Sequence, residues 1–368
     1  MKIVADQNML MVDHFFAELG SITYLPGRTI TAADVADADL LLVRSITEVN
    51  QSLLDGSSVA FVGSATIGTD HVDQAYLKAQ GIGFAHAPGC NADAVVQYDL
   101  SVLSRLQPDW LQSTVGIVGC GNVGSRLYRS LTNLGVRCRV YDPFLAADST
   151  VNQIDFKTVL DAQVICLHTP LTQSGSHPTQ HLFNAEVLSQ LDESTLLINA
   201  GRGAVIDNLA LLARLRSGSS LRVALDVWEY EPTINLELLD RVALATPHIA
   251  GHSVEGKLRG TQMLATAYHA WANHEQSSEN REPAITVASS AKTVAAETLS
   301  ELILASYDVS QDDARFRAAL HSSLQSSVAI GETFDLLRKQ YPERHEFGYY
   351  RAEAPSEIRA QALQLGFC

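Results

Sequence analysis

Residues 114–125, TVGIVGCGNVGS, decide the fold of this chain. An apolar run typical of a β-strand leads directly into a glycine-rich loop, and a segment of helical character follows. Gly119 permits the tight turn out of the strand, Gly121 leaves room for the phosphates of a ligand, and Gly124 lets the helix pack close to the sheet. The start of the helix then directs backbone N–H groups toward an anion. The residues that we expect to bind a pyrophosphate are Gly119, Gly121, Asn122, Val123 and Gly124.

A second apolar run, residues 136–141, ends at an acid, Asp142. This position lies about twenty residues beyond the glycines, where a dinucleotide-binding fold places the carboxylate that accepts hydrogen bonds from the adenosine ribose. The carboxylate would repel a 2′-phosphate, and the following Pro143 and Phe144 supply no cation. The sequence therefore predicts NAD rather than NADP as the cofactor. The alternative, a simple glycine turn followed by a solvated aspartate, does not explain why motif, spacing and strand context agree.

Length and composition limit the class of protein. A chain of 368 residues is long enough for two or three domains. Its formal charge of −15 and pI near 5.2 argue against nucleic acid or an anionic membrane as a partner. The five cysteines are scattered, which indicates reduced thiols and neither a disulfide framework nor a metal site. We find no signal peptide and no stretch that could span a bilayer, and we expect a cytoplasmic protein.

Two α/β domains are predicted from the alternation of apolar runs with helical segments. Residues 1–93 are expected to form a small parallel α/β domain, and residues 94–253 a doubly wound, Rossmann-like domain that binds NAD. The helical pattern of residues 255–274 would return the chain to the first domain, so that 1–93 and 254–282 together form the substrate-binding domain. The cofactor cleft would then lie between the two domains.

The last part of the chain, residues 283–368, is expected to be a mainly helical domain that follows a linker at 276–291. It contains no second nucleotide motif, repeat or low-complexity run, and we interpret it as a dimerisation domain of a homodimer. The helices predicted for it are 294–304, 312–320, 331–340 and 355–365.

Polar residues follow several apolar runs, at the edge where open α/β sheets bind ligands. In the first domain these are Arg44, Ser45 and Thr66, which are candidate substrate contacts, although ordinary turn chemistry would explain each of them alone. In the second domain three such loops contain Arg202, Glu231 and His248.

The three residues of the second domain suit hydride chemistry on a 2-hydroxy acid. His248 would take the hydroxyl proton, because imidazole titrates in the appropriate range. Glu231 would bind the other ring nitrogen and orient it, and Arg202 would hold the substrate carboxylate. A solvated arginine, a helix-capping glutamate and a loop histidine remain the alternatives for the single residues.

The ordered set of motifs resembles the D-isomer-specific 2-hydroxyacid dehydrogenases over residues 1–274. It comprises Gly119-x-Gly121-x-x-Gly124 with Asp142, the run 168–172 (HTPLT), the run 199–203 (NAGRG), Asp226 with Glu231-Pro232, and the run 246–251 (TPHIAG). The resemblance implies an NAD-dependent dehydrogenase with His248 as the proton-transferring residue, Glu231 as its partner and Arg202 as the carboxylate anchor. It also implies substrate contacts from Ser45 and Thr66. The residues that it places on NAD are Asp142, Thr169, Ala200, Gly201, Asp226 and Gly251.

Within that family the chain looks most like a branch that oxidises a phosphorylated four-carbon 2-hydroxy acid and has a helical C-terminal extension. It departs from that branch at His252, where a tyrosine near the substrate phosphate is usual. His252 is therefore expected to contact the substrate, and Arg44 or a C-terminal arginine, such as Arg344 or Arg351 of this or a partner subunit, is the candidate for the phosphate contact. Two alternatives stay open at this point: a dehydrogenase for another D-2-hydroxy acid such as 3-phosphoglycerate, and an NAD-sensing interaction protein on the same scaffold.

Overall fold

The computed structural model describes residues 1–146, 150–151, 153–272, 292–324 and 329–368. They fall into two compact units. The first consists of Met1–Asn91 and the segment that begins at Ser253, and the second of Ala92–His252 and the C-terminal segment to Cys368. The linker predicted at 276–291, the domain boundary at 282 and the last two residues of the helix predicted at 255–274 lie outside the described residues.

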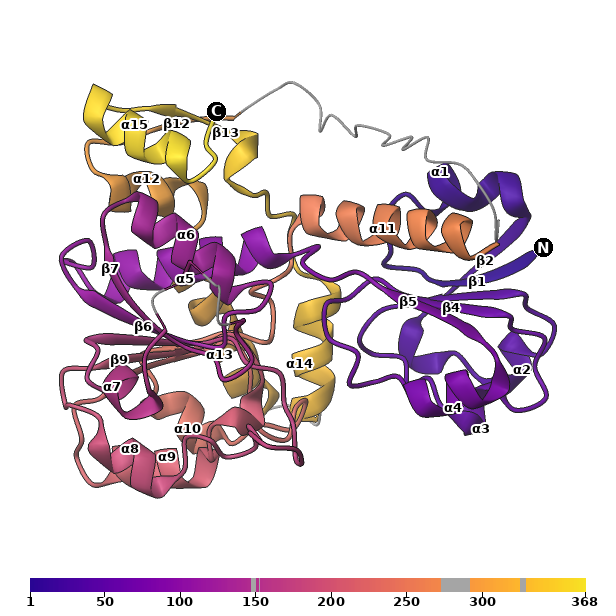
Figure 1. Ribbon diagram of the computed structural model, residues 1–368, viewed down its shortest axis with the longest axis horizontal. Helices are drawn as coiled ribbons and strands as arrows, with labels where there is room; N and C mark the ends of the chain where they lie inside the picture. The colour runs from indigo at the N-terminus through magenta and orange to yellow at the C-terminus, as the bar shows by residue number, and fades with distance from the viewer. Residues whose placement is uncertain (147–149, 152, 273–291, 325–328) are drawn as a thin grey trace. The chain divides into compact units, whose positions relative to one another are not determined.

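The first unit is a parallel sheet covered by helices on both faces (Figure 1). Its strands are β1 (Lys2–Asp6), β2 (Ser21–Leu25), β3 (Leu40–Val43), β4 (Phe61–Ser64) and β5 (Gly83–His86). Its helices are α1 (Val12–Phe16), η1 (Ala17–Leu19), η2 (Gly27–Thr29), α2 (Ala32–Val35), α3 (Gln51–Leu54), α4 (Gln74–Gln80) and α11 (Val254–Ala272).

The strand order of this sheet is β2-β1-β3-β4-β5. Strands β3 and β4 are buried along their whole length, as is typical of parallel strands covered on both faces. Helices α2, α3 and α4 cover one face, and α1 and α11 cover the other. Strand β2 has no apolar run, since it lies at the edge and is largely exposed.

The second unit contains a six-stranded parallel sheet. Its strands are β6 (Thr114–Val118), β7 (Arg137–Tyr141), β8 (Val164–Leu167), β9 (Leu196–Asn199), β10 (Arg222–Leu225) and β11 (Leu244–Ala245). Its helices up to His252 are α5 (Ala92–Leu106), α6 (Gly124–Asn133), α7 (Phe156–Leu160), α8 (Ala185–Gln190), η3 (Gly203–Val205), α9 (Asn208–Arg216) and α10 (Leu236–Arg241).

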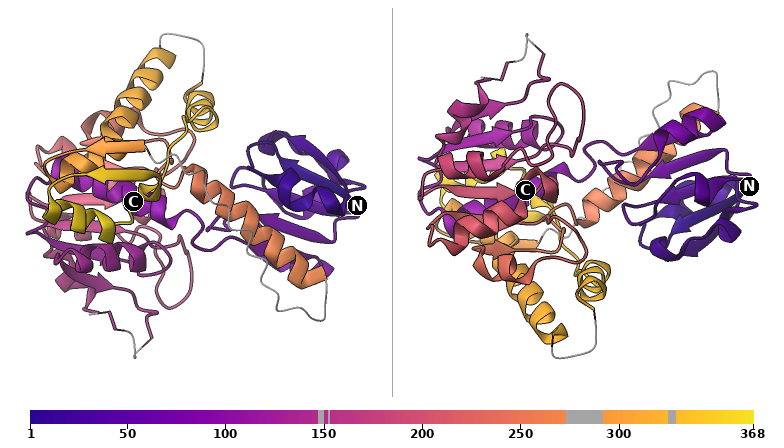
Figure 2. Two further views of the ribbon diagram at one scale, coloured as in Figure 1. Left: turned by 90° about the horizontal axis from the view of Figure 1, so that it is seen from above. Right: turned by 90° about the horizontal axis from the view of Figure 1, so that it is seen from below.

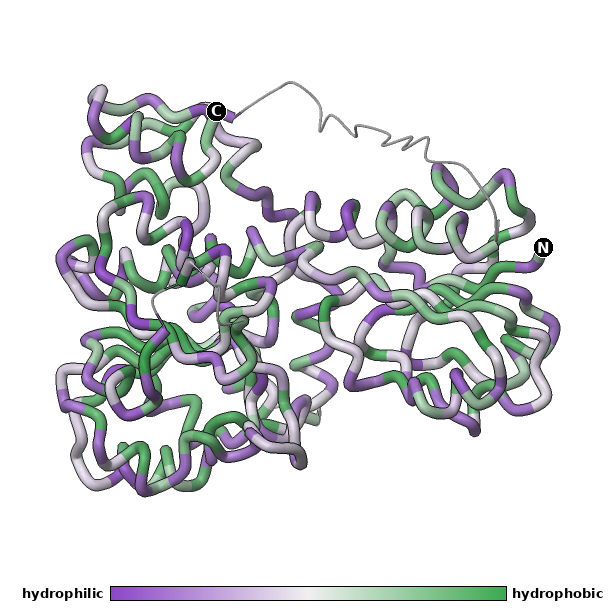
Figure 3. The backbone as a smooth tube through the Cα atoms, viewed as in Figure 1, coloured by the Kyte–Doolittle hydropathy of each residue, from purple (hydrophilic) through white to green (hydrophobic). Residues whose placement is uncertain are grey.

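The strand order β11-β10-β9-β8-β6-β7 confirms the doubly wound, Rossmann-like sheet. Helices α5 and α6 cover one face, and α7, α8, α9 and α10 cover the other (Figure 1). The residues of the central strands are among the most hydrophobic of this unit (Figure 3). Strand β6 lies between β7 and β8. The chain first runs from β6 to β7 on one side and then crosses back to β8 on the other side, so the strand order reverses at β6. Ligands of such sheets bind at the carboxyl ends of the strands at this reversal point.

The C-terminal segment adds helices and a two-stranded sheet to the second unit. Its elements are β12 (Lys292–Ala295), α12 (Leu299–Ser306), α13 (Val309–Ser323), α14 (Ile330–Lys339), η4 (Phe347–Tyr349), β13 (Tyr350–Glu353) and α15 (Ser356–Gln364). Its core residues belong to the same hydrophobic clusters as those of the Rossmann-like sheet: Leu302 with α5, and Phe316 with β10 and β11.

One predicted helix of this segment, 294–304, is wrong at its beginning. Residues 292–295 form β12, which runs beside and parallel to β13 (Figure 2). In this pairing Val294 lies opposite Ala352. The helix starts only at Leu299, because Thr298 and Glu301 form a capping box that satisfies its first N–H groups. Within the described ranges, no helix is both long and apolar enough to cross a lipid bilayer.

Candidate active site

The glycine-rich loop follows β6 at the reversal point of the sheet, and its three glycines have three different environments. Gly119 has a φ of +90°, and a Cβ there would lie 2.8 Å from the His168 backbone. A Cβ on Gly124 would lie 1.9 Å from the carbonyl oxygen of Gly119, so only glycine lets α6 approach the strand this closely. A Cβ on Gly121 would meet nothing within 4 Å. The space beside Gly121 is therefore open to a ligand.

Asp142 lies directly after β7, the strand next to β6. One of its carboxylate oxygens accepts the backbone N–H of Cys120 in the glycine-rich loop at 2.8 Å, and the other accepts that of Phe144 at 2.9 Å. The Asp142 carboxylate is thus held against the glycine-rich loop. Asn122 is exposed and Val123 is half-buried at the N-terminal end of α6, whose first turn contains no acidic side chain.

The loop after β8 borders the same space. The hydroxyl oxygen of Thr169 is buried without a hydrogen-bond partner, and its methyl group would lie 2.9 Å from a Cβ on Gly119. Gly201, after β9, approaches this loop closely, since a Cβ on it would lie 3.0 Å from the carbonyl oxygen of Leu167. The open space at Gly121, the unsatisfied Thr169 hydroxyl and the placed Asp142 fit a dinucleotide, whose phosphates and ribose need these groups.

The loops that contain Arg202, Glu231 and His248 leave three adjacent strands. Strands β9, β10 and β11 end level with one another, since Leu225 pairs with Asn199 on one side and with Ala245 on the other. Arg202 follows β9, is half-buried, and donates from Nη1 to the Gly201 carbonyl at 2.9 Å. The Asn199 side chain fixes this turn, since it accepts from the Gly201 N–H and donates to the Arg202 carbonyl.

Glu231 and His248 are in direct contact. Nδ1 of His248 lies 2.8 Å from Oε2 of Glu231, and the two side chains are 33% and 20% exposed. The other oxygen of Glu231 accepts the backbone N–H of Trp228 at 2.6 Å. His248 has a φ of +56°, a left-handed conformation that is uncommon outside glycine and often marks functional sites. Because Nδ1 is engaged by the carboxylate, Nε2 is the nitrogen left to exchange a proton with a substrate.

The charge of Glu231 follows from its neighbours. Burial by itself would raise its pKa, but the adjacent imidazole, the hydrogen bond to it and the cation of Arg338 outweigh burial and lower the pKa below its ordinary value. Glu231 is therefore an anion at neutral pH.

Asp226 is almost fully buried and holds the backbone that follows His248. Its carboxylate accepts the N–H of Ile249 at 2.8 Å, the N–H of Ala250 at 2.9 Å and the hydroxyl of Thr246 at 2.7 Å. Burial raises the pKa of Asp226, against the lowering effect of these bonds and of His248. The resemblance places Asp226 on NAD. In the structure its bonds are made within the protein, to the loop that contains the histidine.

The remaining predicted site residues lie at strand ends. In the first unit, Arg44 and Ser45 follow β3, and Thr66 follows the adjacent β4. Thr66 is tied into its loop by hydroxyl contacts with Ser64 and the Gly68 carbonyl, both at 2.7 Å, whereas Ser45 is exposed. The other predicted residues, all half-buried in the second unit, are Ala200, Gly251 and His252.

The structure also shows residues that the sequence did not single out. Asp99, on α5, lies with Oδ2 3.0 Å from Nε2 of His168, and both side chains are buried. Tyr98, its neighbour, contacts the Thr246 hydroxyl at 2.9 Å, and Thr246 in turn donates to Asp226. No local pattern would have found the Asp99–His168 and Tyr98–Thr246 pairs, because the members of each are about 70 or more residues apart. A polar residue in an otherwise apolar helical stretch is the one available hint.

Among the described residues, one group of side chains has the spacing of a metal site: His181, Asp207 and Glu229, with ligand atoms within 4.8 Å of one another. These atoms already bind protein groups. His181 Nε2 lies 2.7 Å from Glu229, whose other oxygen accepts the Asn208 N–H, and Asp207 caps α9. Through these contacts, the three side chains join the loop after β10 to the start of helix α9.

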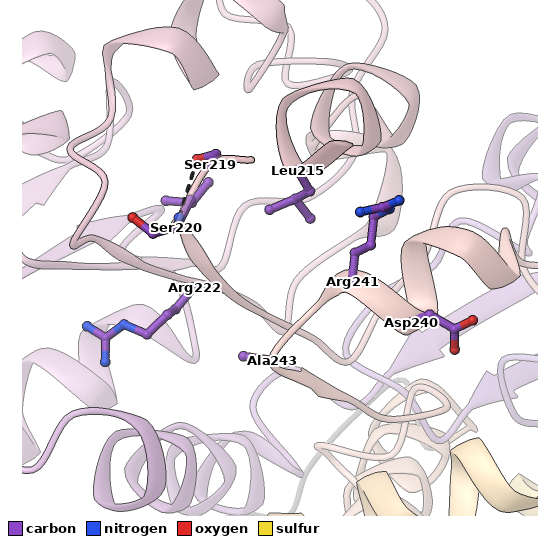
Figure 4. A pocket seen from close by; sticks show the side chains of 8 residues that line it. Leu215, Ser219, Ser220, Arg222, Asp240, Arg241 and Ala243 are labelled. Atoms are coloured by element: carbon purple, nitrogen blue, oxygen red, sulfur yellow. Dashed lines mark hydrogen bonds between the residues drawn. The ribbon is translucent and has the colours of Figure 1, made fainter. Parts of the chain in front are cut away.

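A surface hollow lies at the other end of the strands of the Rossmann-like sheet (Figure 4). Its lining includes Arg222 at the start of β10 and Ala243 just before β11, together with Arg241 at the end of α10. It is thus at the amino ends of the strands, away from the loops that contain Arg202, Glu231 and His248. Arg222 is held there by the Leu106 carbonyl, Gln107 and the Ser194 carbonyl. This hollow does not belong to the candidate active site.

Comparison with known families agrees with this geometry. Residues 100–250 match the model of the D-isomer specific 2-hydroxyacid dehydrogenase, NAD binding domain. Residues 281–366 match a domain of unknown function, DUF3410. The chain is 47% identical to an erythronate-4-phosphate dehydrogenase of Saccharophagus degradans, over 100% of this chain and 99% of the relative. It is 44% identical to the enzyme of that name from Klebsiella pneumoniae, over 100% and 98%.

Solved structures match the fold over about three quarters of the chain. A 3-phosphoglycerate dehydrogenase of Entamoeba histolytica with bound NAD⁺ aligns with a TM-score of 0.65 at 23% identity, over 75% of this chain and 96% of that one. A D-lactate dehydrogenase of Aquifex aeolicus, with NAD and lactic acid, aligns with a TM-score of 0.63 at 22% identity, over 74% and 97%. At this identity the alignments establish the fold.

Proposed function

Because the chain belongs to the D-isomer-specific 2-hydroxyacid dehydrogenases and matches the model of their NAD-binding domain, we propose that its substrate is 4-phospho-D-erythronate, oxidised to 3-hydroxy-2-oxo-4-phosphooxybutanoate. The observation that supports this substrate is the match to relatives of that name along the whole chain, the C-terminal segment included. We further propose that the reaction serves pyridoxal 5′-phosphate synthesis in the cytoplasm.

The proposed chemistry assigns one task to each residue. NAD, when bound, accepts the hydride from C2 of the substrate. His248 removes the C2 hydroxyl proton through Nε2, because Nδ1 faces Glu231 at 2.8 Å. Glu231, an anion, fixes the ring and stabilises its protonated form. Arg202 pairs with the substrate carboxylate through two N–H donors and polarises the C2 oxygen.

Further residues are proposed for binding. Asp142 would accept the ribose hydroxyls, and the glycine-rich loop with Thr169 would bind the phosphates of NAD. Ser45, Thr66 and His252 would contact the substrate, and Arg44 is a candidate for its phosphate group.

A homodimer through the C-terminal segment is also part of the proposal. Within its described part, that segment exposes three leucine side chains that a partner would cover: Leu324 at 63%, Leu336 at 49% and Leu363 at 53%. Light scattering on the protein as it elutes from a size-exclusion column would give the mass of the assembly directly. A mass of one chain at micromolar concentration would refute the dimer.

A substrate panel tests the proposed substrate. The purified protein is incubated with NAD and, separately, with 4-phospho-D-erythronate, 3-phospho-D-glycerate, D-erythronate or D-lactate, and NADH is followed by absorbance. We expect the highest kcat/KM with 4-phospho-D-erythronate. A preference for 3-phospho-D-glycerate would overturn the substrate, and NAD binding without turnover of any acid would favour the NAD-sensing alternative.

A further inference from the structure

Arg344 is a buried arginine of the C-terminal segment, between α14 and η4, and is 6% exposed. Its guanidinium donates to the carbonyls of Ala94, at 3.0 Å, and Ala250 through Nη2, and to that of Ile249, at 3.5 Å, through Nη1. Two of the three acceptors lie directly after His248. A guanidinium engaged in this way within its own chain does not fit the role of phosphate contact considered for Arg344 from the sequence.

The two residues whose carbonyls bind Arg344, Ile249 and Ala250, are the same two whose N–H groups bind Asp226. Asp226 accepts hydrogen bonds from the N–H groups of Ile249 and Ala250, and Arg344 donates hydrogen bonds to the carbonyl oxygens of the same residues. The backbone after His248 thus lies between a buried carboxylate and a buried cation. The His248 N–H completes the arrangement by donating to the Asp226 carbonyl at 2.7 Å. Because His248 has the strained φ of +56°, such bonds are needed to keep it in place.

Arg344 is itself fixed by neighbours from the C-terminal segment. Its Cζ lies 4.3 Å from the centre of the Tyr307 ring. The hydroxyls of Tyr307 and Tyr341 both donate to Oδ2 of Asp312, at 2.8 and 2.7 Å. Burial by itself would lower the pKa of Arg344, but Tyr341, Tyr307 and Asp312 outweigh it and raise the pKa. Arg344 is therefore a cation with a defined orientation, and a precise donor for the two carbonyls.

The C-terminal segment also lies close to Glu231, the partner of His248. Helix α14 packs on the residues that follow Glu231, since a Cβ on Gly331 would lie 3.2 Å from Pro232 and 3.3 Å from Thr233. Arg338, on that helix, contributes to the lowered pKa of Glu231. Both members of the His248–Glu231 pair are thus supported by residues of the C-terminal segment.

We propose that the C-terminal segment positions the His248–Glu231 pair of its own chain, with Arg344 as the positioning residue that acts through the Ile249 and Ala250 carbonyls. This role rests on the proposed function of His248 and is separate from dimerisation. It assigns a task to the region that matches a domain of unknown function. Arg344 touches no reacting atom, and its effect on the reaction passes through the backbone that follows His248.

The test compares Arg344→Lys with Arg359→Lys in the full chain. Lysine keeps the charge of Arg344 but is a compact donor that cannot span three carbonyls. Arg359 lies exposed on α15 and supplies a control in the same segment. We expect Arg344→Lys to lower kcat by about tenfold to a hundredfold, since small displacements of a catalytic group cost this much, with the Kd for NAD within twofold of wild type. Arg359→Lys should keep the wild-type kcat.

A double-mutant cycle shows whether Arg344 acts through the histidine. If it does, the loss caused by Arg344→Lys should disappear in a His248→Asn background, because a misplaced and a missing base are equally ineffective. Hydrogen exchange of the NAD-bound protein gives a readout that needs no substrate. The amides of Thr246 and of residues 248–252 should exchange at least about tenfold faster in Arg344→Lys than in Arg359→Lys.

The outcomes separate this proposal from the proposed function. If wild type fails to oxidise any acid of the panel, the proposed function is wrong, and the exchange of residues 246–252 still decides whether Arg344 holds this backbone. If wild type is active, an unchanged kcat in Arg344→Lys overturns the positioning role. An equal loss in the presence and absence of His248 also overturns it, as does unaltered exchange at residues 246–252.

Discussion

Replacing Gly121 by alanine should separate cofactor binding from stability. The added methyl group would meet no heavy atom within 4 Å, and Gly121 is not among the glycines with a positive φ. The folded state therefore gains no clash, and the unfolded chain loses conformational freedom. We expect the free energy of unfolding without NAD to be unchanged or to rise by about 0.4–1 kcal/mol. The methyl group would, however, occupy the open space that the pyrophosphate of NAD requires.

The expected effect on binding is a Kd for NAD at least about tenfold higher, which corresponds to about 1.4 kcal/mol. Calorimetry measures this Kd, and urea unfolding measures stability. Gly348→Ala is the matched control, since its Cβ would lie 3.6 Å from the nearest heavy atom, an ordinary contact far from the loop in sequence. It should leave the Kd unchanged. A Gly121→Ala protein that binds NAD within twofold of wild type would refute the placement of the pyrophosphate at this glycine.

Three more changes test the other assignments. His248→Asn should lower kcat by about a hundredfold or more with little change in NAD binding, and near-normal turnover would exclude His248 as the base. Asp142→Ala should weaken NAD binding and reduce the preference over NADP, so an unaltered ratio of the two Kd values would argue against the ribose contact. Glu231→Gln tests how stability depends on pH. The folded-state pKa of Glu231 lies below its ordinary value of 4.5. The stability that its charge contributes is therefore present above pH 4.5 and is lost as the pH falls below it. The difference in unfolding free energy between wild type and Glu231→Gln should therefore shrink as the pH falls from about 4.5, and a difference that grows there would contradict the ionic interaction.

The sequence alone determined the class of fold and the glycine-rich loop. Continuous apolar runs between helical segments indicate parallel strands buried on both faces, and β3, β4 and β9 have this pattern. Gly119, Gly121 and Gly124 could be assigned separate tasks because each task depends on local backbone geometry. In the structure Gly119 has a positive φ, Gly121 adjoins open space, and Gly124 lies close to the Gly119 carbonyl. Local patterns failed where an element lacks them, as at the exposed edge strand β2 and at β12, which depends on its distant partner β13.

Only the tertiary structure decided which groups meet. Arg202, Glu231 and His248 could be selected by residue type, but the 2.8 Å contact between the last two depends on strands β10 and β11 ending side by side. Arg344 was considered for a phosphate and proved to be a buried donor to the backbone after His248, about 95 residues earlier in the chain. Periodicity and turn preferences describe neighbours in sequence, whereas such contacts arise from the packing of whole elements, which no single stretch of sequence encodes.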